Sequence, residues 1–261
     1  MSITHHFILF NQLPLMYGRV PKVANSSIKA SLCKLLSSPP DEGVRTTTDS
    51  FWRDATHGET ELITPLQARH NRGTHFSFSF VRNPFDRLVS AYNNKIIENS
   101  DLTKPMLDMG LVSQMAFSEF VDRVCNCADE ELDIHLLPQS TILCAGERLV
   151  PKFVGRLEQI DDHWAALRRR MRREGLPTLG KLPEKNRRRE NLGDLSEYFC
   201  SDALIEKVAS RYQRDIQMFY ADIGIDKLAK NNLNSAAKPS QRGQAKQNKS
   251  TAKQNPTTNQ D

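Results

Sequence analysis

The feature that most constrains the fold of this chain is a strand, a short polar loop and a helix that occur twice within its first hundred residues. The first unit runs from an apolar segment at 15–20 to a stretch, 26–36, in which apolar residues recur with helical spacing. The second runs from the alternating segment 75–81 to a helix that Asn83 can cap and Pro84 can begin. Strands that alternate with helices favour an α/β domain with a mostly parallel sheet covered on both faces.

Apolar periodicity continues along the rest of the chain. It predicts helices at 117–124, 161–173 and 202–219, and short buried strands at 140–144 and 152–155. The segment 38–75 contains two prolines in succession and shows little periodicity, so we expect a long irregular excursion there. The sequence shows no internal repeat and no sign of a second domain, and we expect a single domain.

Charge is distributed unevenly along the chain. The formal net charge is +5, but residues 227–261 carry seven basic side chains and one acidic one, which leaves residues 1–226 near −1. That last segment is rich in Gln, Asn, Lys and Ser and lacks aromatic residues. We therefore divide the chain into a domain, 1–226, and a basic low-complexity tail, 227–261, that we expect to be disordered. Because the basic excess lies in the tail, a nucleic-acid-binding fold is not favoured.

Apolar runs and cysteines both favour a protein that stays in the cytoplasm. No stretch approaches the roughly 18 to 20 consecutive apolar residues of a membrane-spanning helix, and the run at 7–10 is too short for a signal-peptide core. The five cysteines form no CxxC unit, and Cys125 and Cys127 lack a nearby set of further metal ligands. We expect reduced thiols, no bound metal and a cytoplasmic location.

The first loop carries residues that suit an anion. It reads Pro21, Lys22, Val23, Ala24, Asn25, Ser26 and Ser27. The helix that follows offers unpaired backbone N–H groups and a partial positive charge at its N-terminus, and Lys22 adds a full charge. The loop has no glycine and does not match the GxxxxGK[ST] pattern, which disfavours a Walker-type ATPase. An ordinary capped helix start with a solvated lysine is the alternative.

The second loop pairs an arginine with a serine further along the following helix. Arg82 leaves the strand at the carboxyl end of the sheet, where open α/β folds place their ligands. Ser90 lies about two turns, or roughly 9 Å, up the helix. An arginine supplies forked donors for a phosphate and a serine supplies a hydroxyl, so a phosphate could bridge the two.

Together and in this order, the two segments resemble the sulfotransferases that use PAPS (3′-phosphoadenosine 5′-phosphosulfate), and among them the carbohydrate sulfotransferase-like branch. In that family a P-K-x-x-x-[ST]-[ST] loop grips the 5′-phosphosulfate, and a later R-[DN]-P-x-x-R-x-x-S segment grips the 3′-phosphate. Residues 21–27 match the first pattern and residues 82–90 the second. The similarity extends less closely through 133–139, 153–158 and 211–216, and so covers roughly residues 15–220.

The resemblance implies a P-loop-NTPase-like fold and the transfer of the sulfuryl group of PAPS to an acceptor hydroxyl, in the first place on a carbohydrate. It assigns Lys22 to the sulfate and bridging oxygen of the donor, the rest of the 21–27 loop to donor binding, and Arg82 and Ser90 to the 3′-phosphate. A sulfuryl group bears less negative charge than a phosphoryl group, so a lysine and helix N-termini can suffice without Mg²⁺.

The acceptor hydroxyl must lose its proton, for which a histidine or a carboxylate is suited. Related enzymes often take this base from the segment between the two donor motifs, which favours His57 or His70, with Glu59 and Glu61 as carboxylate substitutes, and we place His57 slightly first. His135 belongs to a D-x-H-x-x-P-Q stretch that resembles a family pattern. It is a further candidate, either as the base or as part of the acceptor site.

The role of two basic runs and the choice among several rival functions stay open at this point. The run at 168–173 reads as the solvated face of an amphipathic helix, whereas the one at 185–189 could hold an anionic acceptor or the phosphates of the donor. The leading rival function is a nucleotide-dependent kinase of similar architecture. Others are a non-catalytic PAPS- or anion-binding module and a basic-tailed scaffold for nucleic acid.

Overall fold

Five strands form the central sheet of the computed structural model, which describes residues 5–38, 40–98, 102–183 and 194–233. In spatial order they are β3 (Thr60–Ile63), β1 (Phe7–Phe10), β2 (Leu15–Gly18), β4 (Phe76–Val81) and β7 (Phe153–Arg156). Strands β2, β4 and β7 are parallel neighbours, whereas β1 is antiparallel to both β2 and β3. A separate hairpin joins β5 (Cys144–Ala145) and β6 (Arg148–Leu149). The predicted α/β class with a mostly parallel sheet is confirmed.

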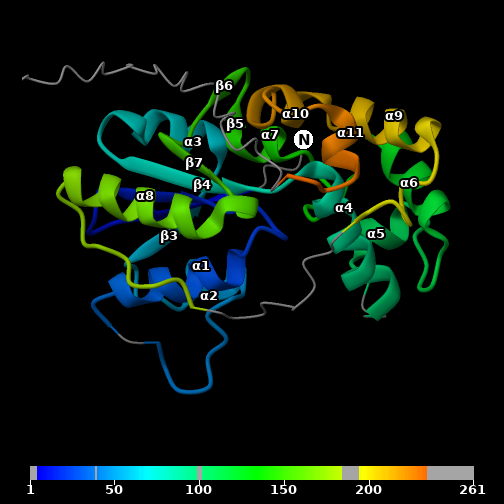
Figure 1. Cartoon of the computed structure of the whole chain (residues 1–261). Helices are drawn as coiled ribbons and strands as arrows, with labels where there is room; N and C mark the ends of the chain where they lie inside the picture. The colour runs from blue at the N-terminus through cyan, green and yellow to red at the C-terminus, as the bar shows by residue number, and fades with distance from the viewer. Residues whose placement is uncertain (1–4, 39, 99–101, 184–193, 234–261) are drawn as a thin grey trace, which may run out of the picture.

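Helices lie on both sides of this sheet (Figure 1). They are α1 (Asn25–Leu32), α2 (Asp49–Asp54), α3 (Pro65–His70), α4 (Pro84–Tyr92), α5 (Lys104–Asp108), α6 (Phe117–Asn126), α7 (Gln139–Leu143), α8 (Ile160–Arg173), α9 (Asp202–Arg211), α10 (Gln213–Phe219) and α11 (Ile225–Ala229). In Figure 1, α1 and α2 lie below the sheet, and α3, α7 and α10 lie above it.

The alternating Phe and Ser residues of β4 divide between these two sides. Its three phenylalanines share one face, on which Phe78 packs 5.1 Å from the ring of Tyr17 and Phe80 packs 5.9 Å from the ring of Trp164 in α8. The serines point to the opposite face, where the hydroxyl of Ser79 donates to the carbonyl oxygen of Gly18 at 2.6 Å. The hydroxyl of Ser79 therefore links β4 to β2 in addition to the backbone hydrogen bonds between the two strands.

The prediction of a strand at 140–144 is wrong, since most of that segment is the helix α7. Its apolar run is short enough to suit either structure. The carboxylate of Asp215 favours the helix, because it accepts hydrogen bonds from the backbone N–H groups of Gln139 and Ser140, at 2.8 and 2.7 Å. This carboxylate satisfies two of the donors that a helix N-terminus leaves unpaired.

Two further predictions need correction. The segment 38–75 is not irregular throughout, because α2, β3 and α3 lie within it and Thr48 and Thr64 cap the two helices. The single helix predicted at 202–219 is interrupted at Tyr212, whose backbone leaves helical geometry between α9 and α10.

The predicted domain boundary at residue 226 falls inside α11, which packs on α4. Leu228 of α11 is fully buried, and its carbonyl oxygen accepts the side-chain amide of Asn83 at 2.7 Å. Residues 234–261 of the predicted tail lie outside the described residues. Within the described part of the chain, no helix has the length and apolar character needed to cross a membrane.

Candidate functional site

The two loops singled out in the sequence lie at the same edge of the sheet. They follow β2 and β4, which are parallel neighbours with Gly18 paired to Ser79, so both loops leave the sheet at its carboxyl end. Nη1 of Arg82 donates to the carbonyl oxygen of Lys22 at 3.2 Å. The structure therefore brings the lysine loop and the arginine loop into direct contact.

The backbone of the first loop adopts an unusual shape. Lys22 and Ala24 both have left-handed backbone conformations, with φ angles of 68° and 59°. For residues other than glycine, this conformation costs on the order of 1 kcal/mol each, and such strain concentrates at functional sites. Helix α1 then begins at Asn25 without a side-chain cap. The loop thus presents the N-terminus of α1 beside Lys22, in the arrangement that binds anions.

The side chain of Lys22 is directed by a residue that the sequence analysis did not single out. Nζ of Lys22 donates to Oδ1 of Asn94 at 3.0 Å. Asn94 lies in a π-helical turn, Asn93–Glu98, that continues α4, and such turns occur frequently at functional sites. The apolar pattern of the sequence continues the helix of Pro84 through this region, because a π-turn leaves no clear signal in that pattern.

Arg82 is held on several sides. Its Nε and Nη2 donate to the two carboxylate oxygens of Asp86 at 2.6 and 2.8 Å, and this ion pair is largely buried. Gln139 makes reciprocal hydrogen bonds with the backbone of Arg82, at 2.9 and 2.8 Å. Ser90 is partly exposed and lies four residues after Asp86, on the same face of α4. Asp86, which pairs with Arg82, therefore lies about one helical turn before Ser90 on α4.

The second arginine of the motif, Arg87, is buried inside the site. Its guanidinium donates to three backbone carbonyl oxygens, those of Pro21 at 3.1 Å, Leu137 at 2.8 Å and Ile134 at 3.2 Å. Burial lowers the pKa of Arg87, although an arginine stays protonated in proteins. One side chain thus joins the lysine loop to the segment that carries His135. The sequence placed Arg87 in the motif but did not reveal this role.

His135 forms a pair with a buried carboxylate. Nδ1 of His135 lies 2.6 Å from Oδ1 of Asp133, and the hydroxyl of Thr103 donates to the other carboxylate oxygen at 2.6 Å. Burial raises the pKa of Asp133, but the hydrogen bonds and charge of His135 and the bond from Thr103 outweigh it and lower that pKa to about 2. The His135 side chain keeps about a quarter of its surface exposed. Its Nε2 is therefore the nitrogen that can meet a substrate.

His57 and His70 lie at the other edge of the sheet. Thr60, which begins β3, pairs with Phe10, at the end of β1 remote from the lysine loop, and His57 precedes it by three residues. His70 ends α3 just before the turn that leads to the start of β4. A strand of four residues is about 13 Å long, so the lysine and arginine loops lie at least that far away. Through Arg87 the fold joins the segment of His135 to the lysine loop, and it does not join His57 or His70 to that loop.

The two carboxylate candidates share that remote edge. Glu59 accepts the backbone N–H groups of Ser37 and Ser38 at 2.7 and 2.9 Å, and these hydrogen bonds hold the pKa of Glu59 below its ordinary value. Glu61 is exposed in the middle of β3. Glu59 thus stabilises the backbone of a neighbouring loop.

The remaining candidates lie away from the lysine and arginine loops or outside the described residues. The run at 168–173 forms the C-terminal half of α8, and the run at 185–189 falls outside the described part of the chain. No group of three or more His, Cys, Asp or Glu residues that could hold a metal was found among the described residues. Burial raises the pKa of Cys125 to about 11 and also raises that of Cys127, so both thiols are protonated at neutral pH.

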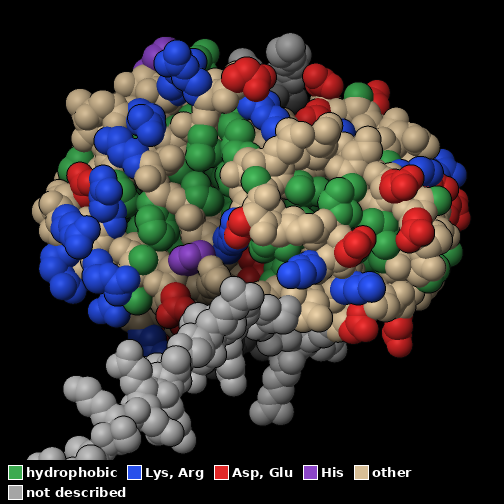
Figure 2. Space-filling model, turned by 45° about the horizontal axis from the view of Figure 1, so that its top comes forward, with side chains coloured by type: hydrophobic (Ala, Val, Ile, Leu, Met, Phe, Trp, Pro, Cys, Tyr) green, Lys and Arg blue, Asp and Glu red, His purple; other side chains and the backbone are tan. Residues whose placement is uncertain are grey.

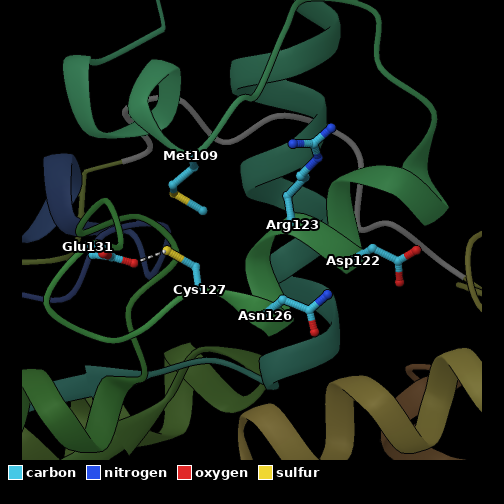
Figure 3. A pocket seen from close by; sticks show the side chains of 6 residues that line it. All are labelled: Met109, Asp122, Arg123, Asn126, Cys127 and Glu131. Atoms are coloured by element: carbon cyan, nitrogen blue, oxygen red, sulfur yellow. Dashed lines mark hydrogen bonds between the residues drawn. The ribbon is translucent and has the colours of Figure 1, made fainter.

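A polar pocket of about 440 Å³ adjoins Cys127 (Figure 3). It is lined by Met109, Asp122, Arg123, Asn126, Cys127 and Glu131. The thiol of Cys127 lies 3.6 Å from the carboxylate of Glu131, while the side chain of Asp122 points away from them. The pocket borders the segment that continues to Asp133, and of the residues that line it only Cys127 was considered in the sequence analysis.

Known proteins resemble this chain over most of its length. The model of a family described as the sulfotransferase family matches residues 5–221. Carbohydrate sulfotransferase 14 of Danio rerio is 23% identical over 243 residues, which cover 84% of this chain and 62% of that protein. The chain thus spans less than two thirds of the length of this relative. No solved structure gave a significant match.

Proposed function

Because this chain belongs to the sulfotransferase family, we propose that it transfers the sulfuryl group of PAPS to a hydroxyl group of a carbohydrate. The observation that carries the proposal is the contact between the two motif loops, in which Nη1 of Arg82 donates to the carbonyl oxygen of Lys22. The similarity to a protein named carbohydrate sulfotransferase 14 supports a carbohydrate as the acceptor. The left-handed turns of the first loop and the N-terminus of α1 support donor binding at this edge.

The two ends of the donor are assigned to the two loops. Lys22, Ser26, Ser27 and the backbone N–H groups at the start of α1 bind the 5′-phosphosulfate, with Lys22 on the sulfate and bridging oxygen. Arg82 and Ser90 bind the 3′-phosphate. Asp86 fixes the plane of the guanidinium of Arg82, so little side-chain entropy is lost when a phosphate binds.

His135 is proposed as the general base. With the Nδ1–H group donating to Asp133, Nε2 carries the lone pair that accepts the proton of the acceptor hydroxyl. As the acceptor oxygen bonds to sulfur, the bond from sulfur to the bridging oxygen breaks, the proton moves to Nε2, and Lys22 stabilises the charge on the departing phosphate. The carboxylate of Asp133 stabilises the imidazolium that results.

The donor site is tested by isothermal titration of the protein with 3′,5′-ADP, the desulfated product. We expect wild type to bind in the micromolar range. Arg82→Ala should lose roughly 10- to 100-fold in affinity, because hydrogen bonds to charged groups contribute about 1.5–3 kcal/mol. Ser90→Ala should lose less, and Lys22→Ala should chiefly lower the rate of transfer. Arg53→Ala, an exposed arginine outside both loops, is the matched control and should bind as wild type does.

Three rival functions are separated by companion measurements. A kinase of similar architecture would bind ATP and transfer its γ-phosphate, while labelled PAPS would give no product. A non-catalytic module would bind 3′,5′-ADP without transfer to any acceptor. A nucleic-acid scaffold would show steeply salt-dependent binding to nucleic acid. If wild type failed to bind 3′,5′-ADP at all, the proposed function would be wrong.

A further inference from the structure

A surface rich in arginine lies at the end of the domain opposite to the donor loops. We call it the basic surface and define it by seven exposed residues, which are Arg69, Arg72, Lys152, Arg169, Arg170, Arg172 and Arg173. Figure 2 shows Lys and Arg side chains gathered along the left of the molecule, where the C-terminal end of α8 lies in Figure 1, and Asp and Glu side chains mainly on the right. The charge of the domain is therefore separated in space although its sum is small.

Contacts with β4 fix the position of this surface. Trp164, near the start of α8, packs 5.9 Å from Phe80 at the end of β4, whereas Arg170 lies 5.9 Å from the ring of Phe76 at its beginning. Helix α8 is therefore antiparallel to β4. Its basic half lies at the amino edge of the sheet, a strand length of about 20 Å from the loop that carries Arg82.

Elements other than α8 contribute to the same surface. Nε of Arg72 donates to the carbonyl oxygen of Val150 at 3.0 Å, and the backbone N–H of Lys152 donates to the carbonyl oxygen of Ser77 at 2.8 Å. These bonds place the end of α3 and the start of β7 beside the beginning of β4. The basic surface therefore extends across three segments that are distant in the sequence.

Few acidic groups compensate these cations. Glu174 pairs with Arg170 at 2.7 Å, and this is the one ion pair to a carboxylate that the basic surface makes within the described residues. Arg169 and Arg173 lie one turn apart on the same face of α8, with about 6 Å of helix between them. A row of exposed cations at such spacing attracts an anion that repeats along a chain.

We propose that the basic surface binds a polyanionic polysaccharide. Single-stranded nucleic acids are held by aromatic side chains on which bases stack, but the exposed large hydrophobic residues of the described chain include no aromatic one. Membrane-binding basic helices present apolar residues to the lipid, whereas the apolar stripe of α8, which comprises Trp164, Leu167 and Met171, is buried against the sheet. Exposed charge with no exposed aromatic side chain beside it, on a helix whose apolar stripe is buried, fits a sulfated or carboxylated glycan.

The proposed reaction gives such a surface a use, and this step rests on the proposed function. Each transfer adds one sulfate, and hence one permanent negative charge, to the acceptor. On a polymeric acceptor, segments that already carry sulfate accumulate charge at intervals set by the sugar units. The basic surface retains these segments while another segment of the same chain reaches the donor edge, about 20 Å away.

The test is the binding of size-defined heparin fragments to the full-length protein, with 3′,5′-ADP at saturation so that the donor loops are occupied. The variant is Arg169→Glu with Arg173→Glu. The matched control is Lys104→Glu with Arg123→Glu, which changes the net charge equally and replaces exposed cations that lie outside the basic surface. We expect the Arg169/Arg173 variant to lose at least about tenfold in affinity and about two from the slope of log K against log salt. The control should stay within about threefold of wild type.

Three results would overturn the proposal. One is equal loss in the variant and the control, and another is heparin binding that the variant leaves unchanged. The third is tighter binding of duplex DNA or of anionic phospholipid vesicles than of heparin, provided that this binding depends on the same two arginines. Such a result would make the partner a nucleic acid or a membrane. Binding of 3′,5′-ADP is measured separately on each variant, so a failure of the proposed function is distinguished from a failure of this proposal.

Discussion

Oδ1 of Asp133 accepts hydrogen bonds from both the ring and the backbone of His135, with Nδ1 at 2.6 Å and the backbone nitrogen at 2.8 Å. The carboxylate thereby fixes the orientation of the imidazole relative to its own main chain. Arg87 in turn ties the neighbouring carbonyl oxygen of Ile134 to that of Pro21, next to Lys22. The proposed base and Lys22 thus belong to segments that one hydrogen-bonded network joins.

This pair predicts a division between catalysis and donor binding. His135→Gln should lower kcat by about 10² to 10⁴, the usual contribution of a general base, and leave the Kd for 3′,5′-ADP within about threefold of wild type. Asp133→Asn should lower kcat less, because the ring stays in place but the imidazolium loses its counter-charge. The measurement is transfer from labelled PAPS, with titration of 3′,5′-ADP alongside.

His57→Gln is the comparison that decides between the two histidines. His57 lies at the amino edge of the sheet, so the kcat of the His57→Gln variant should match that of wild type. A loss of kcat in His57→Gln with normal turnover in His135→Gln would reverse the assignment of the base.

Arg87 is expected to stabilise the fold and also to set the rate of transfer. Arg87→Met leaves three buried carbonyl acceptors without a donor and should lower the free energy of unfolding by about 2–4 kcal/mol in urea titrations. Arg87→Lys keeps the charge but cannot reach three carbonyl oxygens with a fork, so it should fold better and still show a reduced kcat. Normal kcat in a folded Arg87→Lys protein would limit this residue to a structural role.

His6 predicts a loss of stability in mild acid. It is buried, its Nδ1 has no hydrogen-bond partner, and burial together with the charge of Arg19 lowers its pKa to about 4. Below the ordinary histidine pKa of about 6.5 the unfolded chain takes up a proton that the folded protein resists, so stability falls from about pH 6.5 down to about pH 4, by up to about 3 kcal/mol.

Replacement of the ring isolates this contribution. In His6→Phe, the difference in unfolding free energy between pH 7.5 and pH 4 should shrink by that amount, as measured by urea unfolding at a series of pH values. An unchanged pH dependence in His6→Phe would assign the acid sensitivity to other groups.

Gly155 is predicted to be required by the packing of the sheet. A Cβ atom built on Gly155 would lie 2.3 Å from the ring of Phe80, which is itself fixed against Trp164. Gly155→Ala should therefore lower the free energy of unfolding by about 1–3 kcal/mol, as overpacking of a core does. Gly180→Ala is the control, because a Cβ there meets nothing within 4 Å. Equal thermal stability of the two variants would contradict the prediction.

The sequence by itself determined the parts of this protein that depend on local order. The two strand, loop and helix units, the capping of α4 by Asn83 and the residues of both motif loops could be read from short windows, because propensity, periodicity and motif spacing act over a few residues. The fold class followed from the alternation of those units. The pairing of β2 with β4 then required the two loops to meet.

Only the tertiary structure decided the parts that depend on partners distant in the sequence. Asp215 stabilises the start of α7 although it lies 75 residues further along the chain than Ser140. Arg87 joins Pro21, 66 residues before it, to Ile134, 47 residues after it. The proposal of His135 rather than His57 as the base depends on the same kind of distant partner. A residue's nearness along the chain to a motif says little about which edge of the sheet it occupies, whereas burial forces each polar group to find a partner wherever the fold provides one.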